Sequence, residues 1–222
     1  MPQVAWSFSA LKTFQSCPKK YYHLKVLKDV KEQPSEIMLY GIDAHKAAEL
    51  YIANNQELPG KYEFMRKQLD KLKELDGEKH CEFKFGLTKE MQPCDFFAKD
   101  VWLRGAIDLL VVNTEKGIAR MIDYKFGKSK NADMSQLQLM SLAVFKMFPE
   151  IKKVKAGLLF CAEDKMMPVQ YEQDKAPVMW MDWLPEVARL EASYENNVWN
   201  PNPSGLCKAW CPVVSCLHNG RR

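Results

Sequence analysis

The chain has 222 residues, of which 47% are hydrophobic and 27% charged, and its formal net charge is +4. That length suffices for one domain with a buried core, and the composition is ordinary for a globular protein. No run of about 18 apolar residues occurs, which excludes a membrane-spanning helix. The mild positive charge permits a nucleic-acid partner without indicating one.

How the seven cysteines are interpreted depends on the redox state of the compartment in which the protein is expected. The N-terminal sequence lacks a basic segment followed by an apolar stretch, so we expect no signal peptide and a cytoplasmic protein. Thiols stay reduced in the cytoplasm. The seven cysteines are therefore interpreted as metal ligands and core residues, in preference to disulfides. No membrane partner is expected, because no membrane-spanning run or signal peptide is present.

The N-terminal part of the chain is predicted to be helical. Ser7 or Ser9 can cap a short helix, and Pro18 can end that helix and open a second one. Apolar residues at helical spacing predict an amphipathic helix over 37–53. A more polar helix follows and ends near Gly77.

The hydrophobic period then changes from helical to alternating. Alternation over 80–87 predicts a half-buried strand. Two richer apolar runs follow, over 101–112 and 118–126, and a short polar segment that ends in Gly117 separates them. This arrangement predicts a β-hairpin.

The second half of the chain alternates between helix and strand. We expect a helix over 133–147, a strand over 154–161 with a possible partner over 168–171, and a last helix that starts near Pro185. The tail from Asn200 is rich in proline and glycine and is predicted to be irregular. The order predicts the α/β class: a mixed sheet flanked by helices, in one domain spanning the whole chain, 1–222.

Two acids interrupt the apolar runs of the predicted hairpin, Asp108 in the first strand and Asp123 in the second. A carboxylate inside such a strand is costly unless it is paired or coordinated. On neighbouring strands, the two acids can hold a Mg²⁺ or Mn²⁺ ion, which prefers hard oxygen ligands. Lys125 shares a strand face with Asp123 and can position a water and offset negative charge.

The alternative for this set is a salt bridge at the surface. An acid followed two residues later by lysine is a weak pattern, because it occurs five times in the chain. Only Asp123 and Lys125 lie in an apolar strand that follows another apolar strand with its own acid. That context favours a catalytic centre.

A third partner for the acids is expected from the helix over 37–53. His45 and Glu49 share one helix face, and Gly41 lies one turn earlier, where a glycine would let the helix approach closely. The alternative for a lone histidine is a structural or exposed residue.

Four of the cysteines lie near the ends of the chain. Cys207, Cys211 and Cys216 lie in the irregular tail, and Cys17 is the natural fourth ligand. Thiolates favour an iron–sulfur cluster or zinc, with unligated thiols as the remaining alternative. Such a centre would join residues 1–30 to residues 200–222. The other three cysteines fit packing positions.

These motifs together resemble the PD-(D/E)XK nuclease superfamily, in its RecB-like branch, which includes CRISPR adaptation nucleases and many phage exonucleases. The opening motif runs from Ser7 to Tyr21 and includes Cys17, and the helix motif is Gly41 with His45. The two core motifs are the segments 104–108 and 123–125. The resemblance covers most of the chain.

The resemblance implies a restriction-endonuclease-like core sheet and a specific division of roles. Asp108 and Asp123 would be metal ligands, and His45 would bind the same metal. The backbone carbonyl of Tyr124 would be a further ligand, and Lys125 would be the catalytic lysine.

The next motif of the family is a helix with Gln-x-x-x-Tyr. Gln136 fits its first position and could hold DNA or ordered water, although Met140 replaces the tyrosine. Gln138 is the competing choice. The alternative is that both glutamines are exposed polar positions on an amphipathic helix.

The branch also carries a 4Fe–4S cluster in many members, held by one early cysteine and three late ones. Cys17, Cys207, Cys211 and Cys216 have this layout. The family's late spacing is usually x₂ and then x₅, whereas this chain has x₃ and then x₄. Zinc stays the less favoured alternative.

Taken together, the sequence predicts a Mg²⁺- or Mn²⁺-dependent DNA exonuclease. Lysines interleaved with tyrosines near the start, and lysines after Asp123, suit a groove for a DNA end or single strand. The resemblance suggests recombination, replication or repair, and a compact chain without helicase motifs suits a phage or mobile-element protein. The rivals are a non-catalytic module that binds single-stranded DNA and a zinc-stabilised RNA-processing enzyme.

Overall fold

The structure is a computed structural model that describes residues 4–221. It divides into two compact units. One contains the residues up to Pro34 together with those from Met181 on, and the other is Ser35–Trp180. The organisation as a single domain over 1–222 stays a prediction. Within the described residues, no helix has the length and hydropathy needed to cross a membrane.

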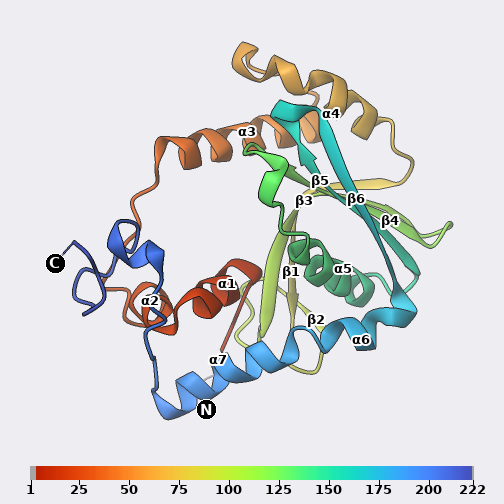
Figure 1. Cartoon of the computed structure of the whole chain (residues 1–222). Coiled ribbons are helices and arrows are strands. Elements are labelled where there is room, and N and C mark those ends of the chain that lie inside the picture. Colours follow the sequence, from red (N-terminus) through yellow and green to blue (C-terminus); the bar gives the residue numbers. More distant parts are fainter. Residues whose placement is uncertain (1–3, 222) are drawn as a thin grey trace. The chain divides into compact units, whose positions relative to one another are not determined.

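The unit Ser35–Trp180 is a mixed sheet flanked by helices (Figure 1). Its six strands have the order β2-β1-β3-β4-β5-β6. Neighbouring strands are antiparallel except β4 and β5, which are parallel and are joined through α5. The elements of this unit are α3 (Glu36–Asn54), the 3₁₀ helix η2 (Gly60–Met65), α4 (Arg66–Lys73), β1 (Glu78–Leu87), β2 (Pro93–Cys94), β3 (Leu103–Asn113), β4 (Ile118–Lys125), the 3₁₀ helix η3 (Ser129–Asn131), α5 (Ser135–Met147), β5 (Lys153–Phe160), the 3₁₀ helix η4 (Cys161–Glu163), β6 (Lys165–Glu172), the 3₁₀ helix η5 (Gln173–Lys175) and α6 (Ala176–Trp180).

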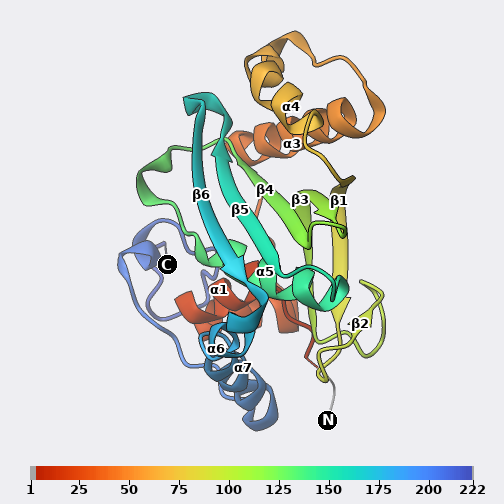
Figure 2. The same cartoon turned by 90° about the vertical axis from the view of Figure 1, so that its right-hand side faces the viewer.

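The sheet is covered by helices on both faces (Figures 1 and 2). Helices α3 and α4 pack over Leu109, Ile122 and Tyr124 in one continuous apolar core. Helix α5 packs against β4 and β5, on the face to which the alternate residues of β4, Asp123 and Lys125, project. The α/β class is therefore confirmed.

Most predicted elements are present with bounds shifted by a few residues. The expected hairpin is β3 and β4, and the expected helices over 37–53 and 133–147 are α3 and α5. Among the strands and α-helices, two were missed, the two-residue strand β2 and the five-residue helix α6. Neither is long enough to show a hydrophobic period.

A glycine in β3 explains part of the motif 104–108. Gly105 lies opposite Phe85 of β1. The Phe85 ring is buried and covers this glycine, so that a Cβ atom at position 105 would lie 2.6 Å from the ring. The ring therefore occupies the space that a side chain would take and fixes β1 beside β3.

The other unit is helical and contains the irregular tail. Its elements are α1 (Phe8–Ser16), α2 (Pro18–Tyr21), the π-helical turn η1 (Tyr22–Leu27), α7 (Leu184–Asn196) and the 3₁₀ helix η6 (Gly205–Lys208). Of the two candidate caps for α1, it is Ser7 whose side chain accepts the Ala10 N–H. The cap of α2 is the sulfur of Cys17, which accepts the Lys20 N–H.

Aromatic rings attach the tail to α2 within this unit. Trp199 follows α7 and stacks on Tyr21 at 5.9 Å and on Tyr22 at 5.1 Å between ring centroids. Phe14 and Tyr194 meet the same tryptophan edge-on. Stacked and edge-on rings stabilise such clusters, so the irregular tail is held here by side chains instead of a β-ladder.

Candidate functional site

The candidate site lies where β3 and β4 separate. The last pair of residues in the β3–β4 ladder is Leu109 and Ile122. Asp108 and Asp123 are the next residues beyond this pair, one on each strand. Beyond that point the Asp108 carboxylate accepts the backbone N–H of Tyr124 at 2.7 Å. The carboxylate thus replaces a ladder partner, which fixes its position between the strands.

His45 reaches this carboxylate from α3. Its Nδ1 atom lies 3.2 Å from Asp108 Oδ2. Burial lowers the pKa of His45, but the contact with the Asp108 carboxylate outweighs burial and raises it overall. The expected proximity of helix and strands is present. The explanation given for Gly41 is wrong, however, because no described atom from outside its own stretch of helix lies within 4 Å of the position a Cβ would take there.

Glu82 of β1 is a member of the site that sequence reasoning missed. Ligand atoms of His45, Glu82 and Asp108 all lie within 4.8 Å of one another, a grouping that could hold a metal ion. Burial and the Asp108 charge raise the pKa of Glu82. Its backbone φ is +50°, in the left-handed region that is unfavourable for a residue with a Cβ atom. Strain of this kind is typical of functional sites.

Asp123 lies beside this group and is not a member of it. It is only 4% exposed. Its Oδ2 atom lies 2.7 Å from Lys125 Nζ, and this oxygen has no other hydrogen-bond partner among the described residues. Burial and the Asp108 charge raise the pKa of Asp123 to about 6, against the lowering effect of Lys125. The unused lone pairs fit a cation ligand.

Lys125 also contacts helix α5. Its Nζ atom donates to Gln136 Oε1 of α5 at 3.3 Å. The amide nitrogen of Gln136 in turn lies 3.9 Å from the sulfur of Met140, the residue that replaces the expected tyrosine. Of the two glutamines considered, Gln136 is thus the one that contacts the lysine.

A cavity opens beside the acids and offers room for substrate. Its volume is about 500 Å³. The lining combines the ligand group with two lysines that can neutralise phosphate charge. The lining residues are Ile42, His45, Lys46, Glu49, Glu82, Lys84 and Asp108.

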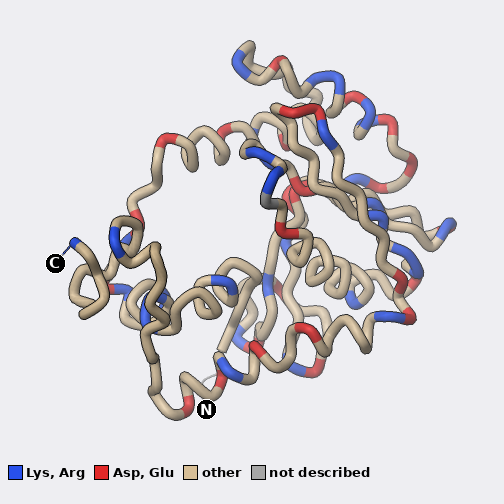
Figure 3. Tube along the Cα trace, in the orientation of Figure 1, with Lys and Arg blue, Asp and Glu red and all other residues tan. Residues whose placement is uncertain are grey.

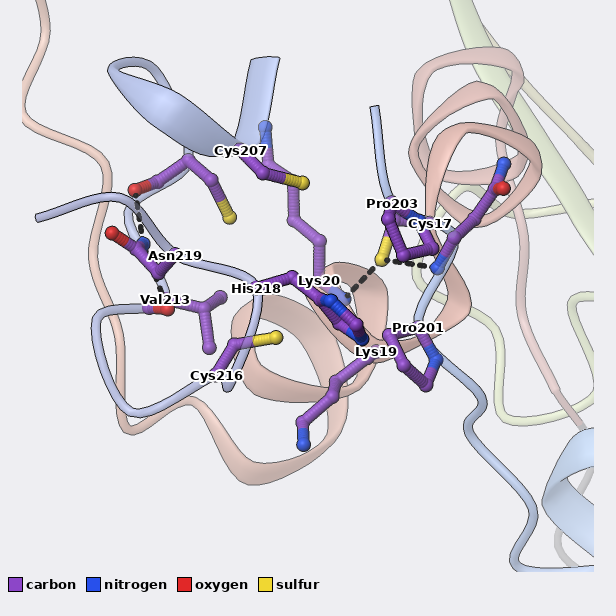
Figure 4. A pocket seen from close by; sticks show the side chains of 12 residues that line it. Cys17, Lys19, Lys20, Pro201, Pro203, Cys207, Val213, Cys216, His218 and Asn219 are labelled. Carbon is purple, nitrogen blue, oxygen red and sulfur yellow. Dashed lines mark hydrogen bonds between the residues drawn. The ribbon is translucent and has the colours of Figure 1, made fainter. Parts of the chain in front are cut away.

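The four terminal cysteines line a separate hollow in the helical unit (Figure 4). All four are free thiols in the structure. The sulfur of Cys17 accepts the N–H groups of Lys20 and Asn202, both at 3.4 Å. The sulfur of Cys207 accepts the Ser204 N–H at 3.4 Å. Both sulfurs therefore act as hydrogen-bond acceptors at the wall of the hollow.

The fold and the site together define a metal-dependent nuclease: a mixed sheet that brings three acids, a histidine and a lysine together where β3 and β4 separate. The chain belongs to the PD-(D/E)XK nuclease superfamily, whose family model matches residues 5–78 and 62–216. Proteins of this superfamily are nucleases that use divalent metal ions. Nucleic acid is therefore the substrate class.

Comparison with solved structures adds little to this assignment. The crystal structure of SSO0001 has a TM-score of 0.43 and 11% sequence identity, covering 99% of this chain and 88% of its own. A likeness of that degree carries no functional argument. No curated protein matches the sequence.

The raised pKa of Asp123 predicts a stability effect in metal-free protein. A raised carboxyl pKa means that the charged form destabilises the fold above about pH 6, and the penalty is relieved as the pH falls toward the unfolded value of about 4. We expect Asp123→Asn to be more stable than the native chain by about 1–3 kcal/mol near pH 8, with a difference that shrinks toward pH 5. Urea unfolding with a chelator at several pH values measures it. A variant that is less stable at the higher pH would show that the Lys125 ion pair dominates.

Proposed function

We propose that this protein is a Mg²⁺- or Mn²⁺-dependent deoxyribonuclease of the RecB-like branch, acting as an exonuclease on DNA ends or single strands. The observation that carries the proposal is the grouping of His45, Glu82 and Asp108 beside the ion pair between buried Asp123 and half-buried Lys125. The resemblance of the motifs supports a place in recombination, replication or repair.

The donor set suits a hard divalent cation, because carboxylate oxygens predominate and an imidazole completes it. His45, Asp108 and Asp123 would hold the ion, with Glu82 and the Tyr124 carbonyl as further ligands. A bound ion lowers the pKa of water and neutralises phosphate charge.

Lys125 has the role of orienting the attacking water and offsetting charge on the phosphate. The contacts with Asp123 at 2.7 Å and with Gln136 at 3.3 Å hold its ammonium group from two sides. A donor fixed before reaction stabilises developing charge without reorganisation. Gln136 acts through this lysine and is therefore a positioning residue.

Basic residues beside the site support DNA as the substrate. Figure 3 shows lysines along the connection that follows β4, next to acidic positions on the strands. Lys128 and Lys130 are exposed there. The Glu163 carboxylate accepts the Ser129 N–H at 3.3 Å and Lys165 donates to the Ser129 hydroxyl at 2.9 Å. The β5–β6 turn thus anchors a loop that can contact the phosphate backbone.

We further propose that Cys17, Cys207, Cys211 and Cys216 hold a 4Fe–4S cluster that stabilises the helical unit. Backbone donors to two of the sulfurs and the shared hollow support a metal centre. The layout of one early cysteine and three late ones, which the resemblance associates with a 4Fe–4S cluster, favours that cluster over zinc.

The nuclease proposal predicts a specific pattern of cleavage. Purified protein with Mn²⁺ is expected to digest end-labelled DNA, and Asp108→Ala or Lys125→Ala should each reduce the rate by at least about 100-fold. Lys116→Ala is the matched control, because that lysine forms an exposed ion pair with Asp76 away from the site. Tight DNA binding without cleavage by the native protein would contradict the proposal and support a binding module.

The cluster has its own test. Protein purified without oxygen is expected to be brown, with a broad absorption band at about 400 nm, and to contain about four iron atoms per chain. Cys17→Ala should lose the colour and lower the unfolding temperature, while Cys94→Ala, which changes a cysteine outside the hollow, should retain both. Colourless protein with one zinc ion per chain would refute the cluster and leave the nuclease proposal standing.

A further inference from the structure

One arginine near the candidate site has no acidic partner. Arg104 of β3 is half-buried. Within the described part of the chain, its guanidinium forms no ion pair and donates no hydrogen bond. It lies over the Phe96 ring instead, with its central carbon 5.4 Å from the ring centroid. A guanidinium is permanently charged and offers five N–H donors, so Arg104 has donors available for an anionic ligand.

A lysine reaches the same ring from the neighbouring strand. Lys84 of β1 is exposed, and its Nζ atom lies 6.0 Å from the Phe96 centroid. It too has no acidic partner among the described residues. Lys46, another lysine at the cavity, differs because its ammonium is paired with Glu49 at 2.8 Å. The face of the ring attracts both cations but leaves their charge unbalanced.

The strand register places both cations on one face of the sheet. In the β1–β3 ladder, Lys84 lies opposite Ala106. Arg104 lies opposite Gly86, two positions further along. The two cations are therefore diagonal neighbours on the same face, each with a small residue opposite it. Lys84 also lines the cavity that contains the candidate metal ligands, so the pair extends the floor of that cavity.

This pair lies a short way along the strands from the acids. Glu82 is two residues before Lys84 on β1, and Asp108 is four residues after Arg104 on β3. At about 3.3 Å per residue, the backbone positions of the two cations are about 7 Å and 13 Å from those of the acids. A nucleic-acid chain that runs along the sheet from the acids therefore places its next phosphates above these cations.

We propose that Arg104 and Lys84 form a phosphate-binding subsite that holds the substrate beside the scissile bond. The inference rests on the proposed nuclease function and adds the direction in which the substrate leaves the metal site, along β1 and β3 towards Phe96. Arg104 binds a phosphate through two N–H groups, and Lys84 supplies a second positive charge. Phe96 acts through these cations and is a positioning residue.

The surroundings of the pair favour a phosphate of the substrate over an acidic group of a partner protein. A Cβ atom at Gly86 would lie 2.8 Å from the carbonyl oxygens of Cys94 and Asp95. The segment around β2 therefore crosses the sheet face and closes the floor at this end. Lys84 faces the cavity on the other side. A substrate bound at the metal ligands thus passes the pair before it meets this segment.

The salt dependence of binding tests the two charges directly. Single-stranded oligothymidine, titrated in Ca²⁺ and followed by fluorescence anisotropy, should bind more weakly as salt rises. The slope of log K against log salt should fall by about 0.7 for each phosphate contact that is lost. We expect that loss in Arg104→Gln and in Lys84→Gln, whereas Arg104→Lys keeps the charge and the native slope. A residue with only a structural role would lower the unfolding temperature and leave the slope unchanged.

Arg120→Gln is the matched control. Arg120 lies on β4 of the same sheet, is half-buried as Arg104 is, and has no ion-pair partner among the described residues. It lines a different cavity, together with Leu72 and Ile122. Its replacement should therefore leave the slope and kcat/KM unchanged. Lys84→Gln keeps the test decisive if Arg104→Gln does not fold, because the Lys84 side chain is exposed.

A neutral linkage locates the phosphate that the pair binds and separates this inference from the proposed function. Oligothymidines with one methylphosphonate linkage, moved stepwise from the cleaved bond, each lack one negative charge. At one or two neighbouring positions the linkage should weaken binding to the native protein at least about 10-fold and add nothing in Arg104→Gln. Equal losses in both proteins at every position would overturn the subsite, even if the enzyme is active. The expected coupling in a protein that cleaves no DNA would leave the subsite standing and count against the nuclease.

Discussion

The site depends on one interaction, the hydrogen bond from the Tyr124 backbone to the Asp108 carboxylate. It forms where the β3–β4 ladder ends, so a side chain takes the place of a strand partner. This bond holds the carboxylate at the sheet edge, where His45 arrives from α3 and Glu82 from β1. Three elements distant in sequence therefore meet at a single oxygen-rich point, which is the arrangement that a divalent cation requires.

Without a cation, this grouping of acidic side chains destabilises the fold, and both the carboxyl pKa values and the backbone show that cost. Burial and a neighbouring acid raise the pKa values of both Asp123 and Glu82. Glu82 also has a left-handed backbone. Such costs are typical of functional sites, where stability is lower than the fold would otherwise allow. A cation offsets these costs, and Lys125 moderates them in its absence.

The sequence predicted the fold class, the hairpin and the relation of Asp123 to Lys125, because strand alternation alone sets which residues share a face. Gln136 was reached only through the resemblance to the family's Gln-x-x-x-Tyr motif, with Gln138 as the competing choice. Glu82 was missed because an acid in an alternating strand resembles an ordinary solvent-facing residue. Only the local backbone conformation and the strand register direct it to the site. Gly41 was misjudged because the helical period alone does not show that the space beside this glycine is open.

The most direct test of this account is Mn²⁺ binding by calorimetry to the native protein and to Asp108→Asn and Glu82→Gln. Both variants should bind Mn²⁺ at least about 10-fold more weakly than the native protein does. Glu78→Gln, which changes an exposed acid of the same strand β1, should bind as the native protein does. Equal Mn²⁺ affinity in the native protein and in Asp108→Asn would contradict the central claim that this carboxylate holds the catalytic cation.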